Sequence, residues 1–337
     1  MHISEGIITG IPAITTTVAA LGVVGVGARH MRRFVAEHPE KKPLLGMAGA
    51  FIFFLSLIPI PAFTGTCSHP CGSPLAGILF GPWIGAALSA LSLLMQAAFF
   101  SHGGFSSWGA NTLALGLAGA GSAWLTFKLA RRCGLSVWWA GALGGLLGDI
   151  MTYMVSGLLL DVALLNAPHP RYSFTEYLMT IYGAYLPTQG PIALVEMVVT
   201  GFAMNAIYQQ RPEVLETLRV VKPAKLAPAA ITTLLVLPLC LVLAAFALSP
   251  AHAAPKAVTV TQAPVTGMDE AVNEHMAQDA GLSPKSSGFD IERMGDLWNT
   301  LLLLAGGTAG FLLGRNWDKL FAKAPRHTSA ITATPQE

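Results

Sequence analysis

Long apolar stretches alternate with short polar segments along the chain. The apolar stretches are 7–28, 44–63, 75–100, 110–127, 136–160, 175–208, 228–249 and 297–314. One helical crossing of a bilayer needs about 20 apolar residues, and a soluble core does not repeat helices of this length in series. The pattern predicts an all-α, polytopic membrane helix bundle with about seven spans up to residue 210 and about two more in a C-terminal module.

Composition agrees with lipid as the solvent. Apolar residues make up 53% of the 337 residues and charged residues 11%, whereas soluble domains carry about 25% charged residues. The net charge of +2 argues against a nucleic-acid partner. The segment Met1–Gly6 lacks the basic start of a signal peptide. Four cysteines are too few for a disulfide framework.

Basic residues set the expected orientation. Lys and Arg cluster at 29–42, 128–132, 211–225 and 315–323, and such loops stay in the cytoplasm. The N-terminus and the polar linker at about 250–290 are then extracytoplasmic, and the C-terminus is cytoplasmic. The expected location is the cell inner membrane.

The segment 59–82 breaks the regular series of spans. Residues 44 and 128 are both expected in the cytoplasm, so the number of crossings between them must be even, yet three apolar blocks lie there. Proline and glycine are dense in 59–82 and interrupt helices. We therefore expect a re-entrant or broken helix at 59–82 and a full crossing at 84–100, which raises the count before residue 210 from six apolar stretches to seven crossings. His69 lies in the broken segment.

The first two residues offer a chelate. The Met1 amine, the His2 backbone nitrogen and the His2 imidazole Nδ1 can close fused rings on one metal ion, and a further nitrogen completes a square. Square-planar nitrogen ligation suits Ni(II) or Cu(II), and cobalt lies close to nickel in the affinity order. The alternative is that His2 is the second residue of an ordinary terminus.

His69 belongs to the run Thr66-Cys67-Ser68-His69-Pro70-Cys71. A histidine on irregular backbone inside a hydrophobic region is costly and is usually functional. The alternative is a solvated loop histidine. Cys67 and Cys71 can add thiolate ligands, which favour zinc or Cu(I), can pair with each other, or can remain thiols.

Further polar residues flank or interrupt the apolar stretches. His102 is expected on the outer side, at the entrance of the site or in a wet loop. Gln96 and Asn111 are candidates for hydrogen bonds that orient a metal-bound imidazole. Asp149 and Glu196 face either a cavity or a neighbouring helix. The residues that can support the ligands are thus Cys67, Ser68, Gln96, His102 and Asn111.

These residues carry a family resemblance. Met1–Gly6, Gly49–Phe53, Gly65–Pro70, Ile78–Pro82, His102–Gly104 and Gly109–Asn111 resemble the CbiM/NikM family of substrate-binding membrane components of energy-coupling factor transporters for cobalt and nickel. The resemblance covers about residues 1–210 and implies a metal-binding membrane domain at 1–225. It implies a metal site formed by Met1, His2 and His69, with Ni(II) or Co(II) as transported substrate. Cys71 departs from the family pattern and leaves the metal preference open.

The resemblance also implies partners. Residues 226–337 resemble the small CbiN/NikN partner, fused on as a two-span module. The chain has no G-x-x-x-x-G-K-[ST] sequence, so the energy for uphill transport must come from elsewhere. The family implies a membrane coupling subunit resembling CbiQ/NikQ and a cytoplasmic ATPase resembling CbiO/NikO. The alternatives are a passive metal channel without an ATPase, or a haem-binding or redox membrane protein.

Overall fold

The computed structural model describes residues 2–57, 60–61, 67–100, 102–218, 220 and 268–285. At 60–61, 67–68 and 268–270 it describes the backbone alone. The chain divides into two compact units, Met1–Asp290 and Ile291–Glu337, and every described residue belongs to the first. Met1 and the two spans predicted at 228–249 and 297–314 lie outside the described residues.

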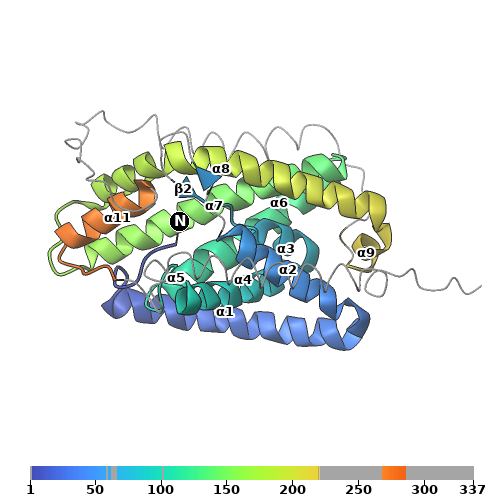
Figure 1. Cartoon of the computed structure of the whole chain (residues 1–337), viewed down its shortest axis with the longest axis horizontal. Coiled ribbons are helices and arrows are strands. Elements are labelled where there is room, and N and C mark those ends of the chain that lie inside the picture. The colour runs from blue at the N-terminus through green and yellow to red at the C-terminus, as the bar shows by residue number, and fades with distance from the viewer. Residues whose placement is uncertain are drawn as a thin grey trace, which may run out of the picture. The chain divides into compact units, whose positions relative to one another are not determined.

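The described part of the chain is almost entirely helical (Figure 1). The prediction of an all-α membrane bundle is confirmed. Two short antiparallel strands, β1 (Ile60–Pro61) and β2 (Cys67–Ser68), lie before His69. The helices are α1 (Gly10–Glu37), the 3-10 turn η1 (Pro39–Lys41), α2 (Lys42–Leu55), α3 (Ser73–Phe80), α4 (Pro82–Phe99), α5 (Trp108–Asn111), the π-helical turn η2 (Thr112–Gly119), α6 (Ala120–Arg132), α7 (Val137–Leu165), α8 (Phe174–Gln210), α9 (Pro212–Thr217) and α11 (Met268–Asp279).

Five stretches of helix among the described residues are long and apolar enough to cross a membrane. They are Gly10–Glu37, Pro82–Phe99, Trp108–Arg132, Val137–Leu165 and Phe174–Gln210. At 14 residues, α2 is only about 21 Å long, shorter than the bilayer core of about 30 Å. The expected total of about seven spans before residue 210 stays a prediction.

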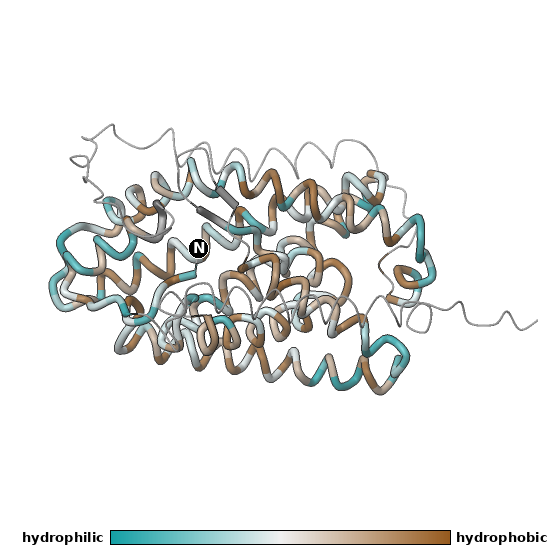
Figure 2. The backbone as a smooth tube through the Cα atoms, viewed as in Figure 1, coloured by the Kyte–Doolittle hydropathy of each residue, from teal (hydrophilic) through white to brown (hydrophobic). Residues whose placement is uncertain are grey.

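The long helices carry their apolar side chains outward as well as inward. Figure 2 shows hydrophobic residues along the lengths of the helices and polar residues at the turns that join them. Ile11 on α1 and Phe202 on α8 are 73% and 60% exposed. Between helices, small residues permit close contact, because a Cβ on Gly77 would lie 2.2 Å from the Ala120 carbonyl oxygen. An apolar exterior around a tightly packed interior fits lipid as the surrounding solvent.

The Gly/Pro-rich region forms a broken helix, as the sequence predicts. Helix α3 ends at Gly81, whose φ of +86° lies in the left-handed region, and α4 begins with Pro82 at its first position. Every residue from Ser73 to Leu79 is buried. This short helix enters the bundle and reverses into the full-length α4. Its depth in a bilayer stays a prediction.

The predicted polar linker contains a helix. Helix α11 packs beside α8 near one end of the bundle (Figure 1). The His169 backbone N–H donates to the Ala280 carbonyl oxygen at 2.9 Å, and the Lys285 N–H donates to the Glu5 carbonyl oxygen at 2.8 Å. The described part of the linker therefore contacts the N-terminal segment that carries His2.

Candidate metal site

The N-terminal segment before α1 is held inside the bundle by hydrogen bonds on the residue that follows His2. The Ile3 N–H donates to Asn111 Oδ1 at 3.0 Å, and Asn111 Nδ2 donates to the Ile3 carbonyl oxygen at 3.2 Å. The Ser107 hydroxyl donates to the same carbonyl. His2 itself is 4% exposed. Asn111 therefore fixes the backbone beside the imidazole rather than the imidazole itself.

Two glycines allow this segment to come close. Gly103 has φ of +77°, and a Cβ there would lie 3.2 Å from the His2 Cβ. A Cβ on Gly104 would lie 2.5 Å from the Glu5 Cα. Any larger residue at 104 would collide with the backbone of the N-terminal segment. The His102-Gly103-Gly104 run thus combines an imidazole with the space that the segment needs.

His69 reaches the same place from the segment between β2 and α3. The backbone leaves this segment through Gly72, whose φ of +68° favours glycine. A Cβ on Gly72 would lie 3.1 Å from the Ile52 Cα of α2. The Glu196 carboxyl group accepts the N–H groups of Cys71 and Gly72. The segment is therefore fixed from two helices just after His69.

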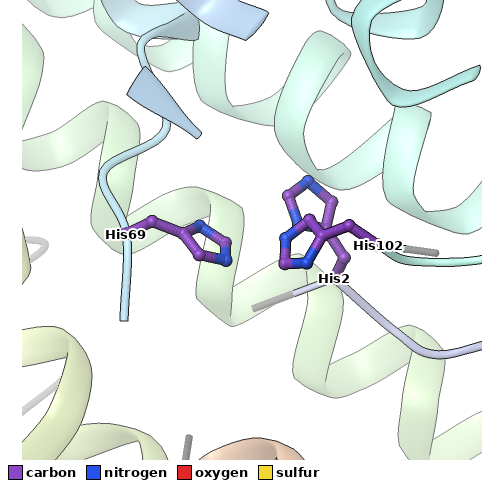
Figure 3. A group of neighbouring side chains, drawn as sticks. All are labelled: His2, His69 and His102. Atoms are coloured by element: carbon purple, nitrogen blue, oxygen red, sulfur yellow. The ribbon is translucent and has the colours of Figure 1, made fainter. Parts of the chain in front are cut away.

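Three imidazoles meet where these segments converge. Their potential ligand atoms, one from each of His2, His69 and His102, all lie within 4.8 Å of one another. Figure 3 shows His69 facing His2 and His102 from the other side of the group. The His2 Nδ1 and His102 Nε2 atoms are 2.7 Å apart. Ring centroids of His2 and His69 are 5.2 Å apart in a stacked arrangement.

This spacing fits one divalent ion. Two nitrogens bound to an ion at about 2.0–2.1 Å lie about 2.9 Å apart when adjacent and about 4.2 Å apart when opposite. The separations in the group, one of them 2.7 Å and all of them within 4.8 Å, are of the same size.

Burial keeps these imidazoles neutral. It lowers the pKa of His102 to about 3. Burial is also the main cause that lowers the pKa of His2 and of His69 well below the usual value for histidine, and the neighbouring His102 lowers both further. Neutral imidazole is the form that binds metal ions. At neutral pH the three ligands need not lose a proton before an ion binds.

Two buried imidazole nitrogens have no hydrogen-bond partner among the described residues. They are His2 Nε2 and His69 Nδ1. A buried polar atom without a partner costs about 1–3 kcal/mol, and native proteins rarely keep one without a reason. A bound ion would give the His69 Nδ1 a partner.

The other residues predicted for the site are not members of the group of three imidazoles. Met1 is outside the described residues, as are the side chains of Cys67 and Ser68. Gln96 donates from Nε2 to the Ser56 hydroxyl and to the Phe53 carbonyl, and the Gln96 backbone carbonyl accepts the His102 backbone N–H. Cys71 is a buried free thiol that donates to Asp149 Oδ1 at 3.1 Å. This contact excludes the Cys67–Cys71 disulfide from the structure.

The sequence predicted His102 at the entrance of the site, as a support for the ligands, or in a wet loop. The structure brings its Nε2 as close to His2 as an adjacent ligand would be. The available signal was the His-Gly-Gly run itself, because paired glycines mark a point where backbones approach closely.

Comparison with known proteins identifies the family of this chain. Residues 2–214 match the family model "CbiM: Cobalt uptake substrate-specific transmembrane region". The chain belongs to the CbiM family. It is therefore a multi-pass membrane protein of a transport family. The expected resemblance is confirmed.

Relatives and solved structures extend this result. A cobalt transport protein CbiM of Geobacter sulfurreducens is 33% identical over 327 residues, covering 96% of this chain and 90% of the relative. The CbiM of Sorangium cellulosum is 37% identical over 231 residues, 68% of this chain and 100% of the relative. A crystal structure of a truncated transition metal transporter has a TM-score of 0.54 at 23% identity, covering 62% of this chain and 99% of that chain. The last comparison shows a shared fold.

Proposed function

We propose that this member of the CbiM family is the substrate-capture component of an ATP-driven importer for Co(II) or Ni(II). One observation carries the proposal. Three imidazoles, those of His2 and His69 buried and that of His102 partly buried, come from segments separated by tens of residues in sequence and converge with their ligand atoms within 4.8 Å. Several separate devices serve this convergence, among them Asn111 on the Ile3 backbone and the Gly103-Gly104 pair.

The proposed ligands are the Met1 amine, the His2 backbone nitrogen and Nδ1, and the His69 imidazole. Nitrogen ligands in a square suit Ni(II), and Co(II) is its neighbour in affinity. The unpartnered Nδ1 of His69 supports its place in this set. His102 Nε2, 2.7 Å from His2 Nδ1, is a further donor. When His2 Nδ1 turns to the ion, His102 either follows it as a ligand or loses its present partner.

The transport setting follows from charge and family. Basic loops in the cytoplasm put the N-terminus and His2 on the outer side of the cell membrane. Separate subunits, a CbiQ/NikQ-like coupling protein and a CbiO/NikO-like ATPase, then supply the energy. Residues 226–337 are proposed to act as a fused CbiN/NikN-like module. The alignment with the Geobacter relative over 96% of this chain supports a shared role for that region.

Metal binding by the purified chain tests the proposal. The chain is titrated with Co(II) and with Ni(II), next to His2→Ala, His69→Ala and a variant with one extra residue before Met1. Each of the three variants is expected to lose high-affinity binding because it removes a ligand or blocks the amine chelate.

His275→Ala is the matched control. Its imidazole is half exposed and lies 3.3 Å from Asp279 on α11, and it is not a member of the described imidazole group. This variant should bind as the unaltered chain does. Wild-type affinity in the extended chain or in His2→Ala would contradict the proposed chelate.

A further inference from the structure

Two carboxyl groups of the bundle interior meet the segment that follows His69. Glu196 on α8 accepts the Cys71 N–H at 2.9 Å through Oε2, and the Gly72 N–H lies 3.2 Å from each of its oxygens. Asp149 on α7 accepts the Cys71 thiol at 3.1 Å. Side chains of α7 and α8 thus bind Cys71 and Gly72, the two residues that follow the segment Ser68-His69-Pro70.

Glu196 is in an unusual place for a carboxyl group. It is 0% exposed and lies on a helix long and apolar enough to span the membrane. Such a group is costly inside a membrane protein and is usually functional. Sequence alone left open whether it bridges helices. In the described residues, Glu196 accepts hydrogen bonds from backbone N–H groups of the segment that follows His69. It also accepts one from the Thr200 hydroxyl of its own helix at 3.4 Å.

The N–H groups that it accepts have no helical partner. Cys71 precedes α3, and Gly72 is the residue that caps it. Backbone donors outside regular structure at membrane depth need acceptors from elsewhere. A carboxyl group with two acceptor oxygens satisfies both donors at once.

The remaining contacts make this segment stiff. Gly72 lies against Ile52 of α2, where an added Cβ would be 3.1 Å from the Ile52 Cα. The next residue, Ser73, donates its hydroxyl to the Leu115 carbonyl at 2.8 Å. Only Pro70 and Cys71 lie between His69 and Gly72, so a shift at Cys71 or Gly72 passes directly to the His69 backbone.

We propose that Glu196 is a positioning residue for metal capture. By holding the backbone of Cys71 and Gly72, its carboxyl group sets where the His69 imidazole stands against His2 and His102. This inference rests on the proposed function, because it assigns Glu196 a role in the same metal site. Glu196 acts through His69 and does not touch the ion.

The first test is the affinity of Glu196→Gln for Co(II). Glutamine keeps the shape of the side chain and one acceptor oxygen, but its amide nitrogen cannot accept an N–H. We expect binding about 10- to 100-fold weaker than in the unaltered chain, the usual cost of losing a residue that orients a ligand. Thermal unfolding of the metal-free protein is measured alongside to confirm that the variant is folded.

Asp161→Asn is the matched control. Asp161 is a 0% exposed carboxyl on α7, and neither of its oxygens has a hydrogen-bond partner among the described residues. Both variants neutralise a buried acid in a long apolar helix, but Asp161 has no described bond to the His69 segment. Affinity in Asp161→Asn should equal that of the unaltered chain. An equal loss in both variants would overturn the positioning role, since it would then be a general effect of buried charge.

The second test separates positioning from a purely structural effect. The absorption spectrum of Co(II) bound at saturating concentration reports its ligands. If Glu196 positions His69, the spectrum of Glu196→Gln should differ from that of the unaltered chain. A weaker-binding variant with an unchanged spectrum would contradict the proposal.

A second substitution guards against misfolding. Glu196→Asp keeps the carboxylate but withdraws it by one methylene, and we expect the same spectral change with a smaller loss of affinity. If the unaltered chain binds no Co(II) or Ni(II), the proposed function itself fails. If it binds them and both Glu196 variants bind as tightly with the same spectrum, only the positioning role fails.

Discussion

Gly104→Ala tests whether the close seating of the N-terminal segment matters for metal capture. A Cβ at this position would lie 2.5 Å from the Glu5 Cα and 2.7 Å from the Glu5 nitrogen. Ordinary contacts between carbon atoms are about 3.5–4.0 Å. One methyl group therefore pushes the segment away by about 1 Å, three residues after His2.

The expected cost follows from that displacement. A misplacement of about 1 Å in a preorganised site can cost about 100-fold, which corresponds to about 2.8 kcal/mol of binding free energy. The site is preorganised here, because Asn111 already fixes Ile3. We expect Gly104→Ala to bind Co(II) or Ni(II) about 100-fold more weakly while the bundle stays folded.

The assay is a calorimetric titration of the purified protein in detergent, with a competing chelator to bring tight affinities into range. Gly22→Ala is the control: Gly22 lies in α1, and a Cβ there would meet nothing within 4 Å. Alanine has a higher helix propensity than glycine, so Gly22→Ala should not destabilise α1 and should bind the metal normally. Equal affinities for Gly104→Ala and Gly22→Ala would refute the reasoning, since the seating of the segment would then not limit binding.

Three further predictions concern the imidazoles. His102→Ala should weaken Co(II) or Ni(II) binding by about 10- to 100-fold in the same titration, and unchanged affinity would remove His102 from the site. Because burial lowers the pKa of all three histidines, they release no proton on binding near neutral pH. The terminal amine, with a pKa of about 7.7–8.0, and the His2 amide each release one proton when the ion binds, so affinity should fall about 100-fold from pH 7 to pH 6. An affinity that does not change with pH would exclude the amine and the amide as ligands. The same pKa shifts predict how the stability of the metal-free protein depends on pH. Each histidine has a lower pKa in the folded chain than the value of about 6.5 in the unfolded chain, so the unfolded chain binds more protons below about pH 6.5. Thermal stability should then decrease as pH falls below about 6.5, by up to about 1.4 kcal/mol per pH unit for each histidine, and stability that rises on acidification would contradict the burial of these groups.

The amino-acid sequence alone predicts part of the fold and part of the candidate site. Span-length apolar stretches predict an all-α membrane bundle, because lipid leaves backbone polar groups no partner but their own helix. The helix break at Gly81-Pro82 also follows from local chemistry, since proline removes a backbone donor and glycine permits positive φ. His2 and His69 stand out as candidates by residue type and by irregular backbone alone. These features depend on short stretches of sequence.

Other features needed the tertiary structure. His102 lies 100 residues after His2, yet His2 Nδ1 and His102 Nε2 are 2.7 Å apart. No local sequence pattern encodes such a pairing. Glu196 lies more than 100 residues beyond Cys71 and Gly72, and only packing reveals that it accepts their N–H groups. Sequence determines which residues can bind a metal or a backbone donor, because that is a property of each side chain. Which of them meet is decided by helix packing, since contacts between distant segments depend on how the whole bundle closes.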